Sequence, residues 1–313
     1  MAMTNPSIAD RGRPSNTSHD IRLQIGEVVC SFTFHDSGLY STLSQLYSAF
    51  LTDKPADVIG DLEFTEQLGP AEIEAAMAEA RYIHEGERFR TTNMIVSGEH
   101  DAEGRYLSMT LEKDMINPNL KVNALNQGLS MAYYTACKLK FNGRPPAMLV
   151  HSCAILRHGR ALLFAGPCDA GKSTIARLCG QEYGQVINDE TVLVSRPQQG
   201  NGTIRVQGVP FIGEVTRLVD STAPLNCILL LKQGERTMVR RLERMEAYLR
   251  FMRQVITPAY IGQGERRVVY ALLAEFADEI TKAIPFYELE FSLDRESLWQ
   301  VVGRLEKTLE MGE

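Results

Sequence analysis

Residues 166–174 constrain the fold of this chain more than any other segment. Their sequence, Gly-Pro-Cys-Asp-Ala-Gly-Lys-Ser-Thr, matches the phosphate-loop pattern G-x-x-x-x-G-K-[ST]. The apolar run 161–165 before the loop predicts a buried strand, and residues 173–179 predict the first turns of a helix. Backbone N–H groups of such a loop and helix N-terminus can surround phosphate oxygens. The sequence therefore predicts an α/β arrangement built around an anion site.

The residue types inside the loop predict a nucleotide triphosphate as the bound anion. Lys172 would reach the β- and γ-phosphates, and the Ser173 hydroxyl would ligate Mg²⁺. Gly166 and Gly171 would let the backbone curl tightly around the phosphates. A chance match in a chain of this length has odds of roughly one in a hundred, and the flanking strand and helix lower them. The residues predicted to contact the nucleotide are Gly166, Pro167, Cys168, Asp169, Ala170, Gly171, Lys172, Ser173 and Thr174.

Composition excludes several classes of function. Of the 313 residues, 44% are hydrophobic and 23% are charged, as in soluble globular proteins. The formal net charge of −6 argues against nonspecific binding to nucleic acid or to anionic membranes. No apolar run approaches the ~20 residues that a membrane span needs, and residues 1–20 contain no apolar segment typical of a secretory signal. We expect a cytoplasmic protein that binds neither nucleic acid nor a membrane.

The six cysteines fit the same expectation of a reducing compartment. None of them forms a C-x-x-C pair, and a chain this large does not need disulfides to fold. Cys168 lies inside the phosphate loop. A small filler residue and a redox sensor are both open interpretations of it, and the first is commoner.

The pattern of elements divides the chain into a tail and two domains. Residues 1–20, rich in Ser, Asn, Pro and Arg, predict a flexible tail. Residues 21–146 predict a small α+β domain that ends in a connector helix with an apolar stripe from Val122 to Ala136. Its other predicted elements are strands at 21–25, 30–34 and 57–64, helices at 39–50 and 70–81, and a hairpin of 92–96 and 106–111 with an acidic turn at 99–104.

Residues 147–313 predict a second domain, which carries the phosphate loop and a mixed β core. Its strands follow one another too closely for the strict βαβ alternation of a standard P-loop sheet. They are expected at 148–156, 161–165, 185–194, 203–206, 227–231, 238–242 and 286–291. Helices are expected at 243–256 and 266–283, followed by a last helix capped by Asp294 with an apolar stripe of Leu298, Val301, Val302 and Leu305.

Two further features near the loop suggest chemistry. Asp189 and Glu190 interrupt an apolar strand 17 and 18 residues after Lys172. Carboxylates there would be costly to bury without a cation or hydrogen bonds, and Mg²⁺ and an acceptor hydroxyl would meet that need. The alternative is an exposed turn between two short strands. His151 lies in the strand before the loop, where a lone histidine is more often a hydrogen-bonded core residue than a functional one.

Taken together, these segments resemble the catalytic domain of HPr kinase/phosphorylase. More closely, they resemble HPr-kinase-related proteins that include kinases found beside peptide-modification genes. The resemblance covers residues 147–245. It rests on Val-His-Ser at 150–152, the loop at 166–174, Asn-Asp-Glu at 188–190, Gly-Val-Pro-Phe at 208–211 and the apolar strand at 223–230.

The resemblance implies a phosphoenolpyruvate-carboxykinase-like P-loop fold and ATP-dependent phosphorylation of a hydroxyl. By position, Asp189 would be the base that deprotonates the acceptor, His151 would help to position it, and Lys172 would complete the catalytic set. Glu190 would lie near the metal, with Ser173 as the other metal ligand.

The chain departs from the HPr kinase pattern in three places, one of which is the absence of its later glycine-rich signature. Its acidic pair is Asp-Glu rather than Asp-Asp, and the stretch 205–208 lacks the Glu and Arg of the Glu-x-Arg-Gly element. HPr itself and the reverse phosphorylase reaction are therefore not expected. Glu214 is either a replacement carboxylate or a solvated turn residue.

We therefore expect an ATP- and Mg²⁺-dependent kinase that phosphorylates a hydroxyl, with serine in a protein or peptide as the acceptor that the resemblance favours. A nucleotide-binding regulator without efficient phosphoryl transfer is the alternative. A carboxykinase acting on a small acid would need further metal ligands, which the sequence does not reveal. The acceptor, which could also be a small molecule, stays open, as do the choice between ATP and GTP, the role of the first domain, and whether the protein forms a homo-oligomer.

Overall fold

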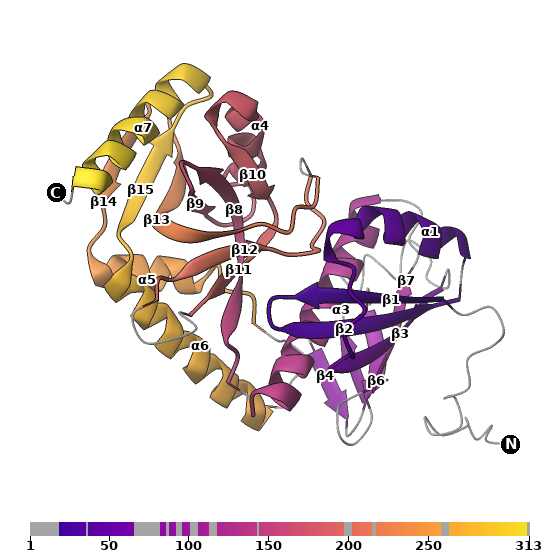
Figure 1. Ribbon diagram of the computed structural model, residues 1–313. Coiled ribbons are helices and arrows are strands. Elements are labelled where there is room, and N and C mark those ends of the chain that lie inside the picture. The colour runs from indigo at the N-terminus through magenta and orange to yellow at the C-terminus, as the bar shows by residue number, and fades with distance from the viewer. Residues whose placement is uncertain are drawn as a thin grey trace, which may run out of the picture. The chain divides into compact units, whose positions relative to one another are not determined.

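The computed structural model describes residues 19–35, 37–65, 82–85, 88–91, 96–100, 106–112, 118–142, 144–196, 202–214, 217–257 and 263–311. The chain divides into two compact units, one before Arg144 and one made of Arg144–Thr257 and Gln263–Glu313 (Figure 1). The helix expected at 70–81, residues 1–18 of the expected tail, and residues 92–95 and 101–104 of the expected hairpin lie outside the described residues.

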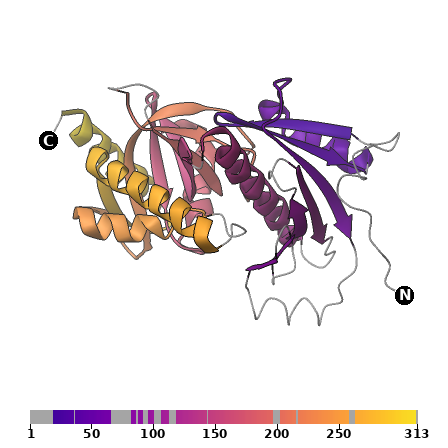
Figure 2. The same ribbon diagram turned by 90° about the horizontal axis from the view of Figure 1, so that it is seen from below.

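The first unit is built on a seven-stranded sheet with the strand order β1-β2-β3-β7-β6-β5-β4. Its helices are α1 (Ser37–Leu46), followed by the short helix η2 (Ser48–Phe50), and α3 (Pro118–Lys140), which packs against β2, β3, β6 and β7 (Figure 2). The strands are β1 (His19–Ile25), β2 (Val28–Phe34), β3 (Val58–Thr65), β4 (Tyr82–Glu85), β5 (Arg88–Thr91), β6 (Val96–His100) and β7 (Tyr106–Glu112).

The strands expected at 21–25, 30–34 and 57–64 are present as β1, β2 and β3 with shifted bounds, and β1 begins at His19, inside the segment expected to be a tail. Strand β1 turns into β2 through Gly26, whose φ of 59° favours glycine. Of the expected first hairpin strand only Val96 is described; it begins β6, which pairs antiparallel with β7 through Glu99 and His100, opposite Ser108 and Leu107. These two residues therefore belong to the strand and not to the acidic turn, because ladder hydrogen bonds to β7 outweigh their weak strand propensity.

The second unit contains an eight-stranded sheet with the order β10-β8-β11-β12-β13-β15-β14, in which β9 also pairs with β8 and β13. The pairings β8–β11, β11–β12, β12–β13, β13–β9 and β9–β8 therefore close a ring of strands. The strands are β8 (Ala147–Arg157), β9 (Arg160–Ala165), β10 (Gln185–Asn188), β11 (Thr191–Ser195), β12 (Arg205–Gly208), β13 (Thr222–Gln233), β14 (Met238–Arg241) and β15 (Phe286–Phe291).

The second unit is a mixed α/β structure, as the sequence predicts, with helices on both sides of its sheet (Figure 1). Strand β13 runs parallel to β9 and β15, whereas the other pairings are antiparallel. The helices are α4 (Lys172–Tyr183), α5 (Arg244–Met252), α6 (Gln263–Ala283) and α7 (Arg295–Met311). In the described part of the chain, no helix is both long and apolar enough to cross a membrane.

One core forms between the sheet and the helices α4 and α7. Every second residue of four neighbouring strands faces these helices, because successive side chains of a strand point to opposite faces. Asp294 caps α7 as expected, accepting hydrogen bonds from the N–H groups of Glu296 at 3.0 Å and Ser297 at 3.2 Å. The strand residues of this core are Cys153, Ile155, Leu162, Phe164, Cys227, Leu229, Leu231, Tyr287, Leu289 and Phe291.

Trp299, which the apolar stripe of α7 does not include, joins α7 to α4. Its indole N–H donates to the Leu178 carbonyl at 2.8 Å, and its ring stacks on Tyr183 at 5.3 Å between ring centres. Arg157 lies over the same indole and forms a two-oxygen ion pair with Glu306, at 2.9 and 3.1 Å from its Nε. Both charged side chains are nearly buried, with 11% and 8% exposed.

Because removing one partner of a buried ion pair leaves the other charge uncompensated, we expect Glu306→Ala to lower the free energy of unfolding by about 3 kcal/mol. Denaturant titration followed by tryptophan fluorescence measures this, since Trp299 contacts Arg157. Glu310→Ala, on an exposed position of the same helix, is the matched control and should change stability by less than about 0.5 kcal/mol. Equal losses in the two variants would contradict a stabilising role for the pair.

Candidate functional site

The predicted phosphate loop connects β9 to α4 and is held in shape by two glycines. Gly171 has a φ of 103°, and a side chain there would approach the Phe291 ring to 2.5 Å. A Cβ on Gly166 would lie 2.7 Å from the Cβ of Ala170. The loop is therefore packed against β15 at one end and against itself at the other, which only glycine permits.

Lys172, the first residue of α4, bends back over the loop. Its ammonium group donates to the carbonyl oxygens of Gly166 at 2.9 Å and Pro167 at 2.8 Å. Only 6% of the residue is exposed. Burial lowers the pKa of Lys172, while the nearby negative charges of Glu190 and Asp169 oppose that shift. The loop thus holds a desolvated cation at the position where phosphate oxygens would bind.

Asp189 and Glu190 lie in a bend that splits the single strand expected at 185–194 into β10 and β11. The buried Asn188 side chain holds this bend in place. Its Oδ1 accepts hydrogen bonds from the N–H groups of Glu190 at 2.7 Å and Thr191 at 3.0 Å. Its Nδ2 donates to the carbonyls of Phe211 at 2.8 Å and Val209 at 3.3 Å. Sequence reasoning had given Asn188 no role, although Asn before a turn is a signal for such side-chain bonds.

The Asp189 carboxylate is buried, with 1% of the residue exposed. Its Oδ2 accepts a hydrogen bond from the Glu214 N–H at 3.2 Å, and a Cβ on Gly213 would come within 2.1 Å of its Oδ1. Glycine at 213 thus leaves room for the carboxylate beside the backbone. The Glu214 side chain is 65% exposed and pairs with Arg177 at 2.7 Å, so its carboxylate is a solvated one.

His151 lies in β8 where the strand changes partners, pairing with Thr191 of β11 just before Ser152 pairs with Ala165 of β9. Its Nδ1 lies 2.9 Å from the Glu190 carbonyl and 3.3 Å from the Glu190 carboxylate. Both neighbours accept hydrogen bonds, so Nδ1 carries the proton and donates it. In the neutral ring Nε2 is then an acceptor.

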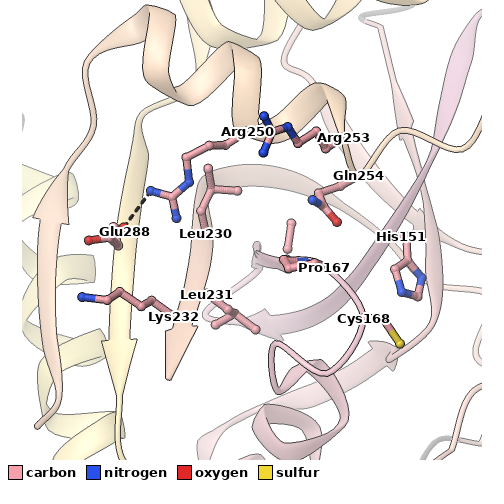
Figure 3. A pocket seen from close by; sticks show the side chains of 12 residues that line it. His151, Pro167, Cys168, Leu230, Leu231, Lys232, Arg250, Arg253, Gln254 and Glu288 are labelled. Carbon is pink, nitrogen blue, oxygen red and sulfur yellow. Dashed lines mark hydrogen bonds and ion pairs between the residues drawn. The ribbon is translucent and has the colours of Figure 1, made fainter. Parts of the chain in front are cut away.

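A pocket of about 560 Å³ lies beside the start of the loop (Figure 3). His151, Gly166, Pro167 and Cys168 contribute to its lining, and Asp189 does not. Figure 3 shows His151 and Cys168 on one side of Pro167, and Lys232 and Glu288 on the other. The rest of the lining comes from Ala165, from Leu230 and Leu231 of β13, and from Arg250, Arg253 and Gln254 at the end of α5.

The described side chains do not form a dedicated metal cage. No group of three or more His, Cys, Asp or Glu residues among them is arranged to hold a metal ion. Mg²⁺ that arrives with a nucleotide needs only one or two protein ligands besides the phosphates. Ser173, half-buried in the first turn of α4, and Glu190, whose side chain is half-buried, are donors of the required oxygen type.

Among the predicted site residues, the structure brings His151 and Glu190 into direct contact. Burial raises the pKa of the Cys153 thiol, with the Asp189 charge adding to this shift and the Lys172 charge opposing it, so both charges lie near this thiol. Glu190 likewise acts on Lys172 and contacts His151. The charged residues of the pocket were missed, because nothing in the sequence connects α5, β13 and β15 to the loop.

Among solved structures, a kinase/phosphatase is similar to part of this chain. The HPr(Ser) kinase/phosphatase from Coxiella burnetii matches with 11% sequence identity and a TM-score of 0.31, over 52% of this chain and 98% of that chain. A similarity this low assigns neither a fold nor an activity. No curated protein matches the chain in sequence.

The family model covers both the loop and its surroundings. It is described as SynChlorMet cassette protein ScmC and matches residues 111–307, which is more than half of the chain. The matched range includes His151, the phosphate loop, the bend at Asp189 and Glu190, and the residues that line the pocket. This chain therefore belongs to the ScmC family.

Proposed function

We propose that this protein transfers the γ-phosphoryl group of ATP to a hydroxyl acceptor, with Mg²⁺ entering as part of the nucleotide substrate. The observation that carries the proposal is the position of Lys172, whose buried ammonium lies over a glycine-shaped loop next to Glu190. A generic anion site would not need the acidic bend and His151 beside it. The sequence resemblance to HPr-kinase-related proteins supports the same class of reaction.

Phosphoryl transfer depends chiefly on positioning and on neutralising negative charge. In the proposed reaction, Lys172 exchanges its two loop carbonyls for phosphate oxygens. This exchange is favourable because an ammonium–phosphate hydrogen bond joins two charges. Backbone N–H groups at the start of α4 add to the positive field. Mg²⁺, bound through the phosphates, would be held by Ser173 and Glu190.

Two groups are candidates for the base that removes the proton of the acceptor hydroxyl. Asp189 is the base that the resemblance implies, but it is buried and does not line the pocket. His151 lines the pocket, and its Nε2 accepts when Nδ1 donates to Glu190. We propose Asp189 as the base and His151 as the group that orients the acceptor, since catalytic contacts often tighten only in the substrate complex.

The alternative function is a nucleotide-binding regulator that does not transfer the phosphoryl group. The burial of Asp189 beneath Gly213 and the Glu214 N–H favours it, because a base must reach its proton. The two functions differ in one measurable property. A kinase consumes ATP in proportion to the acceptor it modifies, whereas a regulator binds ATP without that turnover.

We expect Lys172→Met to reduce phosphoryl transfer at least about 100-fold, because one charged donor to the transferred group is lost. ATP binding should weaken as well, and the rate at which iodoacetamide alkylates Cys168 measures that binding. Cys168 is exposed and the other five cysteines are buried, so bound ATP should protect it specifically. Lys282→Met, at an exposed position on α6, is the control and should leave both readouts unchanged. Unchanged protection by ATP in Lys172→Met would contradict the role of Lys172.

We expect Asp189→Asn to lower the transfer rate at least about 100-fold while ATP affinity changes less than about 3-fold. The variant keeps an oxygen that can accept from the Glu214 N–H and removes only the basic carboxylate. Single-turnover transfer from labelled ATP to a panel of serine peptides measures it. His151→Asn is compared in parallel. A wild-type rate in Asp189→Asn with a large loss in His151→Asn would move the role of the base to His151.

A further inference from the structure

The charges around the pocket are balanced except at one residue. Lys232 pairs with Glu290 at 2.6 Å, and Arg250 pairs with Glu288 at 2.7 Å and Glu246 at 3.1 Å. Among the described residues, Glu288 is the only carboxylate that lines the pocket, and it already forms an ion pair with Arg250 (Figure 3). Two of the three cations that line the pocket therefore have partners.

Arg253 is the third cation, and within the described ranges it has neither an ion pair nor a side-chain hydrogen bond. It follows the last turn of α5, where its backbone N–H bonds to the Phe251 carbonyl. Figure 3 shows it beside Gln254, just beyond the end of the helix that carries Arg250. Arg253 is exposed to solvent, so its guanidinium can exchange water for an anionic group that enters the pocket.

We propose that the pocket is the acceptor site and that Arg253 binds a carboxylate group of the acceptor. This inference rests on the proposed kinase function. The pocket lies against His151 and the first residues of the loop, and in that function the acceptor hydroxyl binds at this position. A guanidinium holds a carboxylate through two parallel hydrogen bonds. A carboxylate fits better than a phosphate monoester, because a second negative charge would face the paired carboxylate of Glu288.

The lining also limits the size and character of the acceptor. Leu230, Leu231, Ala165 and Pro167 contribute its apolar parts, and about 560 Å³ accommodates one or two amino-acid residues rather than a folded domain. The carboxylate can belong to an acidic side chain or to a free chain end. The two sources have the same chemistry, and matched acceptors separate them.

The decisive experiment measures occupation of the pocket without requiring catalysis. Nucleotide-free protein is alkylated with iodoacetamide, and modification of Cys168, which lines the pocket, is followed by peptide mass spectrometry. The probes are N-acetylserine and its neutral amide, N-acetylserinamide, up to about 50 mM at constant ionic strength. We expect N-acetylserine to slow alkylation at least about 3-fold and to act at roughly 10-fold lower concentration than the amide.

Arg253→Gln should abolish the difference between the two probes and leave protection by ATP intact. Arg236→Gln is the matched control, because Arg236 is exposed, lies outside the pocket and has no ion pair with any described residue. It should behave as wild type. Equal protection by the acid and the amide, or a difference that survives in Arg253→Gln, would overturn the proposal.

Phosphoryl transfer then separates this inference from the kinase proposal. Serine dipeptides compared in pairs, with Asp against Asn after the serine and with free against amidated chain ends, identify the source of the carboxylate. If phosphoryl transfer is equal within every pair, in wild type and in Arg253→Gln, the kinase proposal is retained and the proposed carboxylate site is rejected. Acid-selective protection that depends on Arg253, with no transfer to any acceptor, would retain the carboxylate site and reject the kinase.

Discussion

The site depends on the buried side chain of Asn188 more than on any of its charged residues. Its amide makes four hydrogen bonds, two to the N–H groups of the bend and two to the carbonyls at 209 and 211. Where such a backbone group is buried, losing its partner costs about 1–3 kcal/mol. The same amide therefore fixes Glu190 beside His151 and holds the segment whose Gly213 and Glu214 enclose Asp189.

Strand β8 brings this bend to the phosphate loop. Its first half pairs with β11 and its second half with β9, the strand that leads into the loop. The exchange of partners falls at His151 and Ser152, so the bend and the loop approach each other at this point of β8. A ring of strands that closes through β9 leaves little freedom for this arrangement, because β8 is buried on both faces along most of its length and pairs on both edges.

Local signals predicted most of the second unit, including the strand–loop–helix order around 166–174 and the Asp294 cap. They located Lys172, Asp189, Glu190 and His151 because each carries a recognisable chemistry within a short span. The pairing order, the ring closure and the burial of Asp189 were not predictable, because they depend on contacts between distant segments. Arg253 carries no local signal at all, and its position at the pocket follows from the packing of α5 against β15.

The Lys172 ammonium and the Arg253 guanidinium differ in whether they already have hydrogen-bond acceptors. The Lys172 ammonium already has two carbonyl acceptors, so binding an anion there replaces existing hydrogen bonds. The Arg253 guanidinium gains new bonds, since no described residue pairs with it. A cation that exchanges partners suits a nucleotide that must be bound and released in each cycle. An exposed guanidinium with no partner among the described residues suits selection of the second substrate, because an acidic acceptor gains hydrogen bonds there that a neutral acceptor does not.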